Sequence, residues 1–254
     1  MDLGIAGRSA IVCASSKGLG RACATELARA GCLVVINGRN AVTAEKTAAE
    51  IQAETGAKTL VVAGDLNDDK VRDALFAACP APDILVNNNG GPPPREFEQI
   101  SRDDILKGIE ANMLTPIALA QRALPGMAKR GFGRVINITS ASVRSPVARL
   151  DVSSGARAGL TAFLASAARK YARDNVTINS IQPGLFDTDR VKQMFGAGDS
   201  ATAARAARSS TIPAQRIGTP EEFGKLCAYL ASAHAGFIVG QNILIDGGAF
   251  PGAF

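Results

Sequence analysis

The stretch Ile11–Gly20, with the sequence IVCASSKGLG, decides the fold of this chain. Apolar residues at Ser9–Ala14 predict a buried strand, and a helical pattern follows over Leu19–Ala30. Glycines at the start of a helix let the backbone approach a phosphate, and the free N–H groups of the first turn favour negative charge. The stretch therefore predicts a pyrophosphate-binding turn, with an ordinary tight turn as the alternative. The turn consists of Ser15, Ser16, Lys17, Gly18, Leu19 and Gly20.

The rest of the chain alternates short apolar runs with longer amphipathic segments. Runs rich in Val, Ile and Leu without polar alternation are typical of parallel strands buried on both faces. This alternation predicts one α/β domain over residues 1–254, a doubly wound Rossmann fold of about seven parallel strands with helices on both faces. The expected strands are Ser9–Ala14, Cys32–Asn37, Lys58–Ala63, Asp83–Asn87, Arg134–Thr139, Val176–Gln182 and Asn242–Asp246; the expected helices are Leu19–Ala30, Ala41–Thr55, Asp68–Ala78, Arg102–Arg130, Gly155–Asp174 and Pro220–Ser232.

One segment, near 187–212, breaks this alternation. It is rich in Ala, Ser and Arg and lies between a strand end and the next helix. Loops positioned by a rigid scaffold often carry function. We expect a mobile lid of one or two short helices here, which would border the substrate.

Composition excludes several classes of protein. The chain is 46% hydrophobic and 20% charged, as in ordinary globular proteins, and its net charge of +5 comes from scattered Lys and Arg residues. This pattern argues against nucleic-acid binding and leaves a solvated basic surface or a pocket for an anion. No apolar stretch is long enough to span a membrane, and no signal-peptide core is present.

The five cysteines are scattered and form no CxxC pair, which indicates buried thiols in a reducing compartment, the cytoplasm. No Cys, His or Asp cluster has metal-ligand spacing, so we expect no metal. His234, the sole histidine, is expected at the surface.

The second strand ends at Ile36-Asn37-Gly38-Arg39 without an acidic residue. NAD-binding proteins usually place an acid there to accept from the ribose 2′-hydroxyl. Arg39 instead offers a planar cationic fork, and Lys17 a second charge, which together suit a 2′-phosphate. The sequence favours NADP(H) as the cofactor, unless both side chains only face water.

Four motifs resemble those of the short-chain dehydrogenase/reductase family, from about residue 7 to 248. In the first, Ala14 replaces a family glycine; its extra methyl group is tolerable if φ stays negative, but it affects the closest approach of a phosphate. The resemblance implies the same fold and cofactor contacts. The matching motifs are Cys13-Ala14-x-x-x-Gly18-Leu19-Gly20, Asn87-Asn88-Asn89-Gly90, Pro183-Gly184-x-x-x-Thr188, and Gly240-Gln241 with Asp246-Gly247-Gly248.

The resemblance also implies cofactor contacts after the third, fourth and sixth strands. Asp65 and Leu66 would border the adenine, although Asp65 could equally cap the next helix. The implied residues beyond the first turn and Arg39 are Asp65, Leu66, Asn88, Gly90, Pro183, Gly184 and Thr188.

The family's reacting centre is altered here. Ser140 resembles the catalytic serine, and Asn112 stands at the position of the active-site asparagine. The family tyrosine, 13 residues after the serine, is Ser153, and the lysine 4 residues later is Arg157. A serine hydroxyl is a poorer proton donor than a phenol, and arginine supplies charge but no shuttled proton. Arg157 could still hold the nicotinamide ribose and stabilise an oxyanion through its charge. We take Ser140, Ser153, Arg157 and Asn112 as the catalytic candidates.

Several groups could replace the missing proton donor. Pro116 has no N–H, so the carbonyl of Asn112 loses its usual helical partner and could hold a relay water, unless the proline only kinks the helix. Asp151 is a second candidate. Tyr171, about 27 Å along the helix from Ser153, is too far away. Tyr229 does not rescue the pattern either, while Arg144 and Arg149 either bind an anionic substrate or face solvent.

These features favour an NADP(H)-dependent reductase of ketones, such as 3-oxoacyl thioesters, or an oxidoreductase acting on the matching alcohols. Two alternatives stay open: a cofactor-binding sensor or scaffold with little redox activity, and a reductase whose substrate supplies its own proton donor. The resemblance further implies a homodimer or homotetramer, in which the helices Arg102–Arg130 and Gly155–Asp174 pack against a second subunit.

Overall fold

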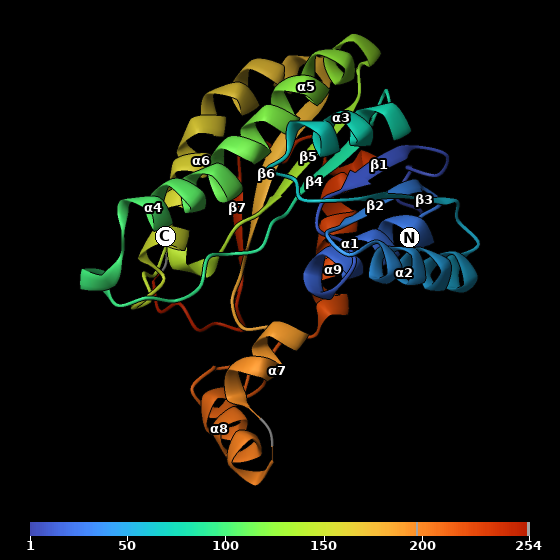
Figure 1. Cartoon of the computed structure of the whole chain (residues 1–254). Coiled ribbons are helices and arrows are strands. Elements are labelled where there is room, and N and C mark those ends of the chain that lie inside the picture. Colours follow the sequence, from blue (N-terminus) through green and yellow to red (C-terminus); the bar gives the residue numbers. More distant parts are fainter. Residues whose placement is uncertain (197, 253–254) are drawn as a thin grey trace.

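The sheet of this protein is entirely parallel. The computed structural model describes residues 1–196 and 198–252. In the described part, a 7-stranded sheet has the order β3-β2-β1-β4-β5-β6-β7 (Figure 1). The expected doubly wound Rossmann fold is thereby confirmed. The strands are β1 (Ser9–Val12), β2 (Leu33–Gly38), β3 (Thr59–Ala63), β4 (Ile84–Asn87), β5 (Gly133–Ile138), β6 (Val176–Pro183) and β7 (Asn242–Ile245).

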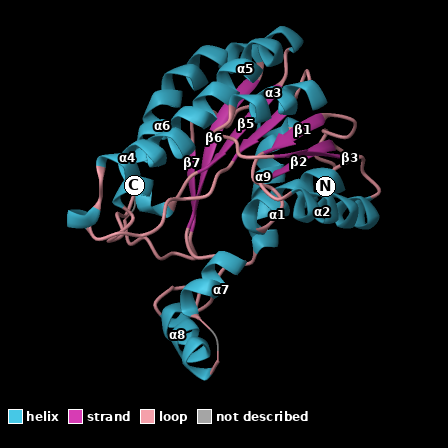
Figure 2. Ribbon diagram, viewed as in Figure 1, coloured by secondary structure: helices cyan, strands magenta, loops and turns pink. Residues whose placement is uncertain are grey.

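Helices cover both faces of the sheet (Figure 2). One layer contains α1, α2 and α9 and buries Leu27, Ile51 and Phe223 completely; the other contains α3, α5 and α6 and buries Leu75 and Met127. Each such side chain contributes roughly 1.5–3 kcal/mol through its burial. The helices are α1 (Gly18–Arg29), α2 (Ala41–Thr55), α3 (Asp69–Ala78), α4 (Arg102–Ile109), α5 (Thr115–Arg130), α6 (Asp151–Tyr171), α7 (Asp189–Phe195), α8 (Asp199–Ser210) and α9 (Pro220–Ala231).

The strand order reverses between β1 and β4. The chain first builds outward from β1 to β2 and β3, and then returns to place β4 on the other side of β1. In open parallel sheets, ligands bind outside the carboxyl ends of the strands at such a switch point. The turns that follow Val12 and Asn87 therefore border the expected binding crevice.

The expected single helix Arg102–Arg130 is interrupted. Glu110–Leu114 forms a π-helical turn, which ends where the N–H of Thr115 donates to the carbonyl of Glu110. Pro116 cannot donate to the carbonyl four residues before it, and a wider turn accommodates that loss. The sequence pattern did not predict this change, because the apolar stripe continues through it.

Helix α6 begins at Asp151, earlier than the expected start at Gly155. The Asp151 carboxylate lies in the first turn, where the helix dipole favours negative charge. As a consequence, Ser153 and Arg157 lie on one helix, one turn apart.

The segment near 187–212 contains the two short helices α7 and α8, which project away from the sheet (Figure 1). The Asp187 carboxylate accepts from Nη1 of Arg205 at 2.8 Å, and Nζ of Lys192 lies 3.9 Å from it. These contacts join the base of the segment to both of its helices. Whether the segment moves as a lid stays a prediction.

All five cysteines are buried and free, as the sequence predicts. Burial raises the pKa of Cys13 and of Cys32 to about 12, so these thiols are unreactive near neutral pH. In the described ranges, 1–196 and 198–252, no helix combines the length and apolar character needed to cross a membrane.

Candidate active site

The turn after β1 has a left-handed residue that the sequence analysis missed. Ala14 has φ of +44°, so the condition under which its methyl group would be tolerated, a negative φ, is not met. The turn must reverse direction directly after the strand, and the resulting positive φ favours glycine at this position. Gly18 also has a positive φ, of +57°. A Cβ on Gly20 would lie 2.4 Å from the carbonyl oxygen of Ala14, so only glycine fits that position.

Two polar residues hold this turn: Asn37, which the sequence analysis did not single out, and Ser15, which it placed in the turn. The Asn37 side chain accepts from the N–H of Ala14 at 3.0 Å and donates to the carbonyl of Val62 at 3.0 Å. The Ser15 hydroxyl donates to the carbonyl of Val12 and accepts from the N–H of Asn37. Asn37 is 1% exposed and so carries a structural role at the end of β2.

The N-terminus of α1 fits a phosphate group. Its N-cap residue, Lys17, makes no side-chain hydrogen bond to the first turn, and that turn contains no acidic residue. Thr188 lies opposite, with Cγ2 3.5 Å from the point where a Cβ of Gly18 would stand. Free N–H groups and the helix dipole together favour an anion at this position.

The end of β2 fits the phosphorylated form of the cofactor. Arg39 follows Gly38 directly and is exposed, and Lys17 is exposed in the neighbouring turn. A Cβ on Gly38 would lie 2.5 Å from Oγ of Ser16, so the strand end and the turn are in close contact. Lys17 and Arg39 each lie one residue from this contact, and no acid directly follows Gly38 that would repel a 2′-phosphate.

Asp65 does not cap α3. Its carboxylate accepts from the N–H of Asn67 at 2.9 Å, and Asp68 is the N-cap residue, accepting from the N–H of Lys70. Asp65 is exposed at the sheet edge, whereas Leu66 is 3% exposed and packs in the core. Contact of these residues with an adenine stays a prediction.

The turn after β4 links the other parts of the site. The Asn88 side chain donates to the carbonyl of Ala14 at 3.2 Å. The Asn89 side chain donates to the carbonyl of Ala111 at 3.2 Å, a contact that an alanine could not make. Asn112 lies in the π-helical turn, 4% exposed, with Nδ2 3.5 Å from the carbonyl oxygen of Gly90.

Three serine hydroxyls form a chain at the end of β5. Oγ of Ser140 accepts from both the N–H and the hydroxyl of Ser142, at 3.1 and 2.9 Å. The Ser154 hydroxyl lies 2.9 Å from Oγ of Ser142 and 2.9 Å from the carbonyl oxygen of Leu150. Ser142 and Ser154 were not found from the sequence, although their spacing from Ser140 and Ser153 places them on the same two elements.

Ser153 and Arg157 are bonded to each other. Nη1 of Arg157 donates to Oγ of Ser153, and the two residues are 7% and 8% exposed. Burial, together with the charge of Arg190, lowers the pKa of Arg157 to about 10, so the guanidinium keeps its charge at neutral pH. Nη2 of Arg157 is 3.5 Å from the carbonyl oxygen of Asn89.

These contacts place the predicted site residues along one edge of the sheet. Ser154 reaches the segment after β5, Arg157 the turn after β4, and Asn88 the turn after β1. Gly184, at the end of β6, is packed so closely that a Cβ there would lie 2.6 Å from Cβ of Asp246.

Other candidates lie elsewhere. Tyr171 is the last residue of α6, and Tyr229 is on α9, across the sheet. The Arg144 guanidinium donates to the carbonyl of Asn242 at 3.1 Å, and Nε of Arg149 pairs with Glu96 at 3.0 Å. His234 is exposed, as expected.

Comparison with known proteins agrees with this geometry. A family model described as Enoyl-(Acyl carrier protein) reductase matches residues 13–249. The chain belongs to the short-chain dehydrogenase/reductase family. The resemblance carried by the four sequence motifs is therefore confirmed.

Individual members of the short-chain dehydrogenase/reductase family match almost end to end. NADPH-dependent reductase BacG of Bacillus subtilis is 33% identical, covering 95% of this chain and 97% of BacG. The 3-oxoacyl-[acyl-carrier-protein] reductase FabG of Aquifex aeolicus is 30% identical, covering 98% and 100%. The structure of L-sorbose reductase from Gluconobacter frateurii, complexed with NADPH and L-sorbose, has a TM-score of 0.94 at 26% identity, covering 99% and 100%.

Proposed function

We propose that this chain is an NADP(H)-dependent reductase of ketones, 3-oxoacyl compounds or similar carbonyls, with a substituted proton-relay site. The observation that carries the proposal is the buried Ser153–Arg157 pair, bonded to each other beside the turn after β4. The relatives named for NADPH-dependent reduction, and the NADPH complex of L-sorbose reductase, support the cofactor and the reaction class.

The residues of the first turn and of β2 would hold the cofactor. The N-terminus of α1, with Gly18 and Gly20, suits the pyrophosphate, and Arg39 with Lys17 suits the 2′-phosphate. When bound, NADPH supplies the hydride that adds to the carbonyl carbon. The remaining chemistry, which this chain's side chains must perform, is to hold the carbonyl oxygen and to deliver a proton to it.

Ser153 and Arg157 would act together on that oxygen. Because Oγ of Ser153 accepts from Arg157, the serine's own O–H hydrogen is free to donate to a substrate oxygen. The guanidinium charge stabilises negative charge that develops there. Ser140, whose Oγ accepts from Ser142, has its own O–H available as a second donor.

The net proton would come from water. Neither arginine nor serine is an effective acid near neutral pH, so each hydroxyl passes a proton on only if it receives one from solvent. The carbonyl of Asn112, to which Pro116 cannot donate, is the main-chain group that we propose holds the relay water. The substrate's own proton donor is the alternative source.

The segment near 187–212 would act as the lid. Thr188 lies against Gly18, and Nη2 of Arg190 is 3.4 Å from the carbonyl oxygen of Pro92, so its base contacts both sides of the crevice.

We also propose a homodimer or homotetramer, in which α4, α5 and α6 form the interface between subunits. Exposed apolar side chains on or near these helices support it: Phe97, Ile105, Leu106 and Phe163. The five free buried thiols support a reducing compartment, the cytoplasm.

Purified protein tests the proposal directly. NADPH oxidation is followed with a panel of ketones and 3-oxoacyl thioesters, for the unmodified chain and for Ser140→Ala and Ser153→Ala. We expect turnover that falls by about 10²-fold in either variant, with unchanged affinity for NADPH. Tight NADPH binding without turnover of any panel member would favour the sensor or scaffold instead. That alternative is supported by Ser153 and Arg157, which stand where the resemblance implies a tyrosine and a lysine.

A further inference from the structure

Two arginine side chains from different elements converge on Gly91. Nη1 and Nη2 of Arg190 lie 3.2 and 3.4 Å from the point where a Cβ of Gly91 would stand, and Nη1 of Arg157 lies 3.5 Å from it. Arg190 belongs to α7, and Arg157 to α6. The absence of a side chain at Gly91 leaves the space between the two guanidinium groups open.

Arg157 has hydrogen-bonding capacity to spare. A guanidinium has five N–H donors, and in the described structure those of Arg157 reach only Ser153 and, at 3.5 Å, the carbonyl of Asn89. Arg134, which is also buried, differs: its guanidinium donates to Ser232, Gly133 and Asn175 at distances from 2.8 to 3.3 Å. The N–H donors of Arg134 thus have several acceptors, whereas those of Arg157 have fewer in the described structure.

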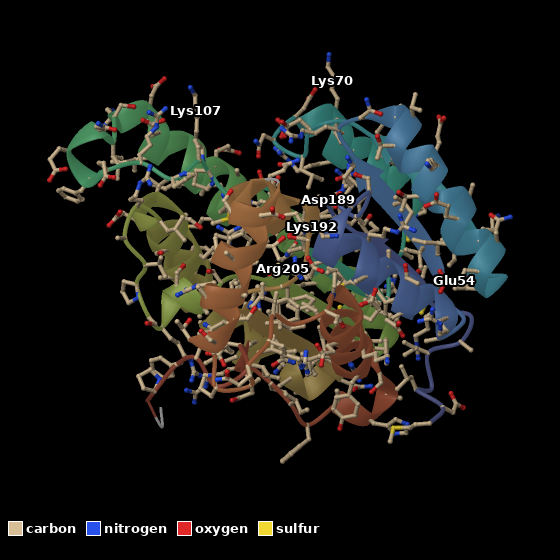
Figure 3. The ribbon with its side chains drawn as sticks, turned by 90° about the horizontal axis from the view of Figure 1, so that it is seen from below. Glu54, Lys70, Lys107, Asp189, Lys192 and Arg205 are labelled. Atoms are coloured by element: carbon tan, nitrogen blue, oxygen red, sulfur yellow. The ribbon has the colours of Figure 1, made fainter. Side chains whose placement is uncertain are left out.

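Arg190 also lacks a carboxylate partner within the described ranges, unlike its neighbours. Lys192 on α7 and Arg205 on α8 both contact the Asp187 carboxylate, and Figure 3 shows the two side chains close together, seen from below. Arg190 instead points toward Pro92, with Nη2 3.4 Å from its carbonyl oxygen. Its charge therefore faces the charge of Arg157 rather than an acid.

Two unpaired guanidinium groups at one place repel each other, and this repulsion contributes to the lowered pKa of Arg157. An anion between them would offset the repulsion and satisfy the free donors, because guanidinium groups bind carboxylates through paired hydrogen bonds. We infer that Arg157 and Arg190 form a binding site for a carboxylate group of the substrate, placed beside the reacting hydroxyl of Ser153. The substrate class is then oxo acids.

The position favours the substrate over the cofactor as the source of this anion. The cofactor's pyrophosphate already has a fitting site at the N-terminus of α1, and its 2′-phosphate has one at Arg39. The Arg157 guanidinium is instead bonded to Ser153, so an anion held by it lies next to the hydroxyl that would face the substrate carbonyl. This inference rests on the proposed reductase function, which it makes more specific.

Binding, rather than turnover, tests the inference. The chain saturated with NADP⁺ is titrated calorimetrically with short 2-oxo and 3-oxo acids and with their methyl esters, which keep the ketone and lose the charge. The unmodified chain is compared with Arg190→Met and with Arg173→Met, a control at an exposed arginine in the short turn after the C-terminal end of α6. The affinity of each variant for NADP⁺ is measured separately.

We expect at least one acid to bind about tenfold or more tightly than its ester. Arg190→Met should abolish this preference and leave the affinity for NADP⁺ within about twofold, while Arg173→Met changes neither. The inference is overturned if none of the acids binds more tightly than its ester. It is also overturned if Arg190→Met loses tenfold in NADP⁺ affinity and keeps the preference for the acid, because the arginine pair would then hold the cofactor. Oxo acids that bind but are never reduced would contradict the reductase and leave the anion site standing.

Discussion

Arg157 donates a hydrogen bond to Ser153, which lies one turn before it on α6. By the sequence resemblance, these two residues stand where the family has a tyrosine and a lysine, a correspondence that stays a prediction. Serine is shorter than tyrosine, and arginine, unlike lysine, does not give up its proton. The two side chains are nevertheless hydrogen-bonded to each other and buried. The site therefore presents a hydroxyl donor, Ser153, and a cation, Arg157, at this edge of the sheet, in place of a phenol and an ammonium.

Restoring the family residues should strengthen the acid. In Ser153→Tyr with Arg157→Lys, an ammonium beside a phenol favours its ionised form and lowers its pKa toward the working range. We expect kcat for ketone reduction to rise by about 10²–10⁴-fold, the usual contribution of general acid catalysis. NADPH absorbance measures it.

The two single variants are the controls for this restoration. Each should gain far less than the double variant, because the phenol and the ammonium act as a unit. A double variant that folds, binds NADPH and is no faster than the unmodified chain would show that the missing acid is not what limits this site.

Exchanging Arg39 should change the cofactor preference. Arg39→Asp removes the fork that suits a 2′-phosphate and adds a carboxylate that can accept from a ribose 2′-hydroxyl. We expect the Kd for NADPH to rise by about 10–100-fold while the Kd for NADH falls. Calorimetry measures both, with Arg173→Asp as a control for the change in charge. Unchanged NADPH affinity in Arg39→Asp would mean that Arg39 only faces water.

Glycine at position 14 should stabilise the protein. Ala14 has φ of +44°, a region that costs an L-residue roughly 1–2 kcal/mol. Part of that gain is lost because glycine makes the unfolded chain more flexible, so we expect Ala14→Gly to stabilise by about 0.5–1 kcal/mol and raise Tm by about 1–4 °C. Ala49→Gly, in the exposed interior of α2, should instead destabilise by about 1 kcal/mol. Calorimetric melting that lowers Tm in both variants would contradict the strain at Ala14.

The strand pattern and the first turn were sufficient to predict the parallel sheet and where its binding edge lies. Apolar runs without polar alternation indicate strands that are buried on both faces. A glycine-rich turn between a strand and a helix favours a phosphate-binding site at the edge of the sheet. The π-helical turn at Glu110–Leu114 was not predictable, since the change from i−4 to i−5 bonding leaves the hydrophobic pattern intact. The sign of φ at Ala14 could not be predicted from the sequence either, because it depends on the direction that the chain takes after β1.

The site was predictable residue by residue only where a motif marks it. Ser140, Ser153 and Arg157 follow from fixed spacing, but Arg190 does not, because its relation to Arg157 exists only in three dimensions. Ser142 and Ser154 were missed for the same reason: serines near a turn are common, and only the fold aligns their hydroxyls.

If the proposed homodimer or homotetramer forms through α6, a charge on the surface of that helix should reduce its size. Phe163 is 54% exposed on α6, and nothing lies within 4 Å of the point where a Cβ of Gly155 would stand, so this face can receive another helix. A charge buried between subunits is costly, and we expect Phe163→Glu to shift the protein to smaller species in sedimentation velocity. Val42→Glu, at an exposed apolar residue of α2, is the matched control and should not change the assembly. Equal sedimentation of all three proteins would argue against an interface through α6.

Acid should remove a stabilising contact at the start of α9. The Glu222 carboxylate accepts from Nη1 and Nη2 of Arg216, at 2.8 and 2.6 Å, and from the N–H of Thr219 at 2.8 Å. Arg216, followed by the Thr219 N–H, lowers the pKa of Glu222 to about 2 in the folded protein. In the unfolded chain the pKa is about 4.3, so the folded state favours the ionised form. The resulting stabilisation is complete above that value and is lost as the pH falls toward 2.

Urea unfolding of the unmodified chain and of Glu222→Gln measures this contribution. Because the pair is partly exposed, we expect a difference of at most about 1 kcal/mol at neutral pH. The difference should shrink steadily below about pH 4 and vanish only as the pH falls through and below about 2, since the protonated carboxyl resembles the amide. Glu221→Gln, one residue away on the same first turn, should show a smaller difference. A gap for Glu222→Gln that stays constant down to pH 2 would mean that the carboxylate charge contributes nothing and that the amide merely packs less well.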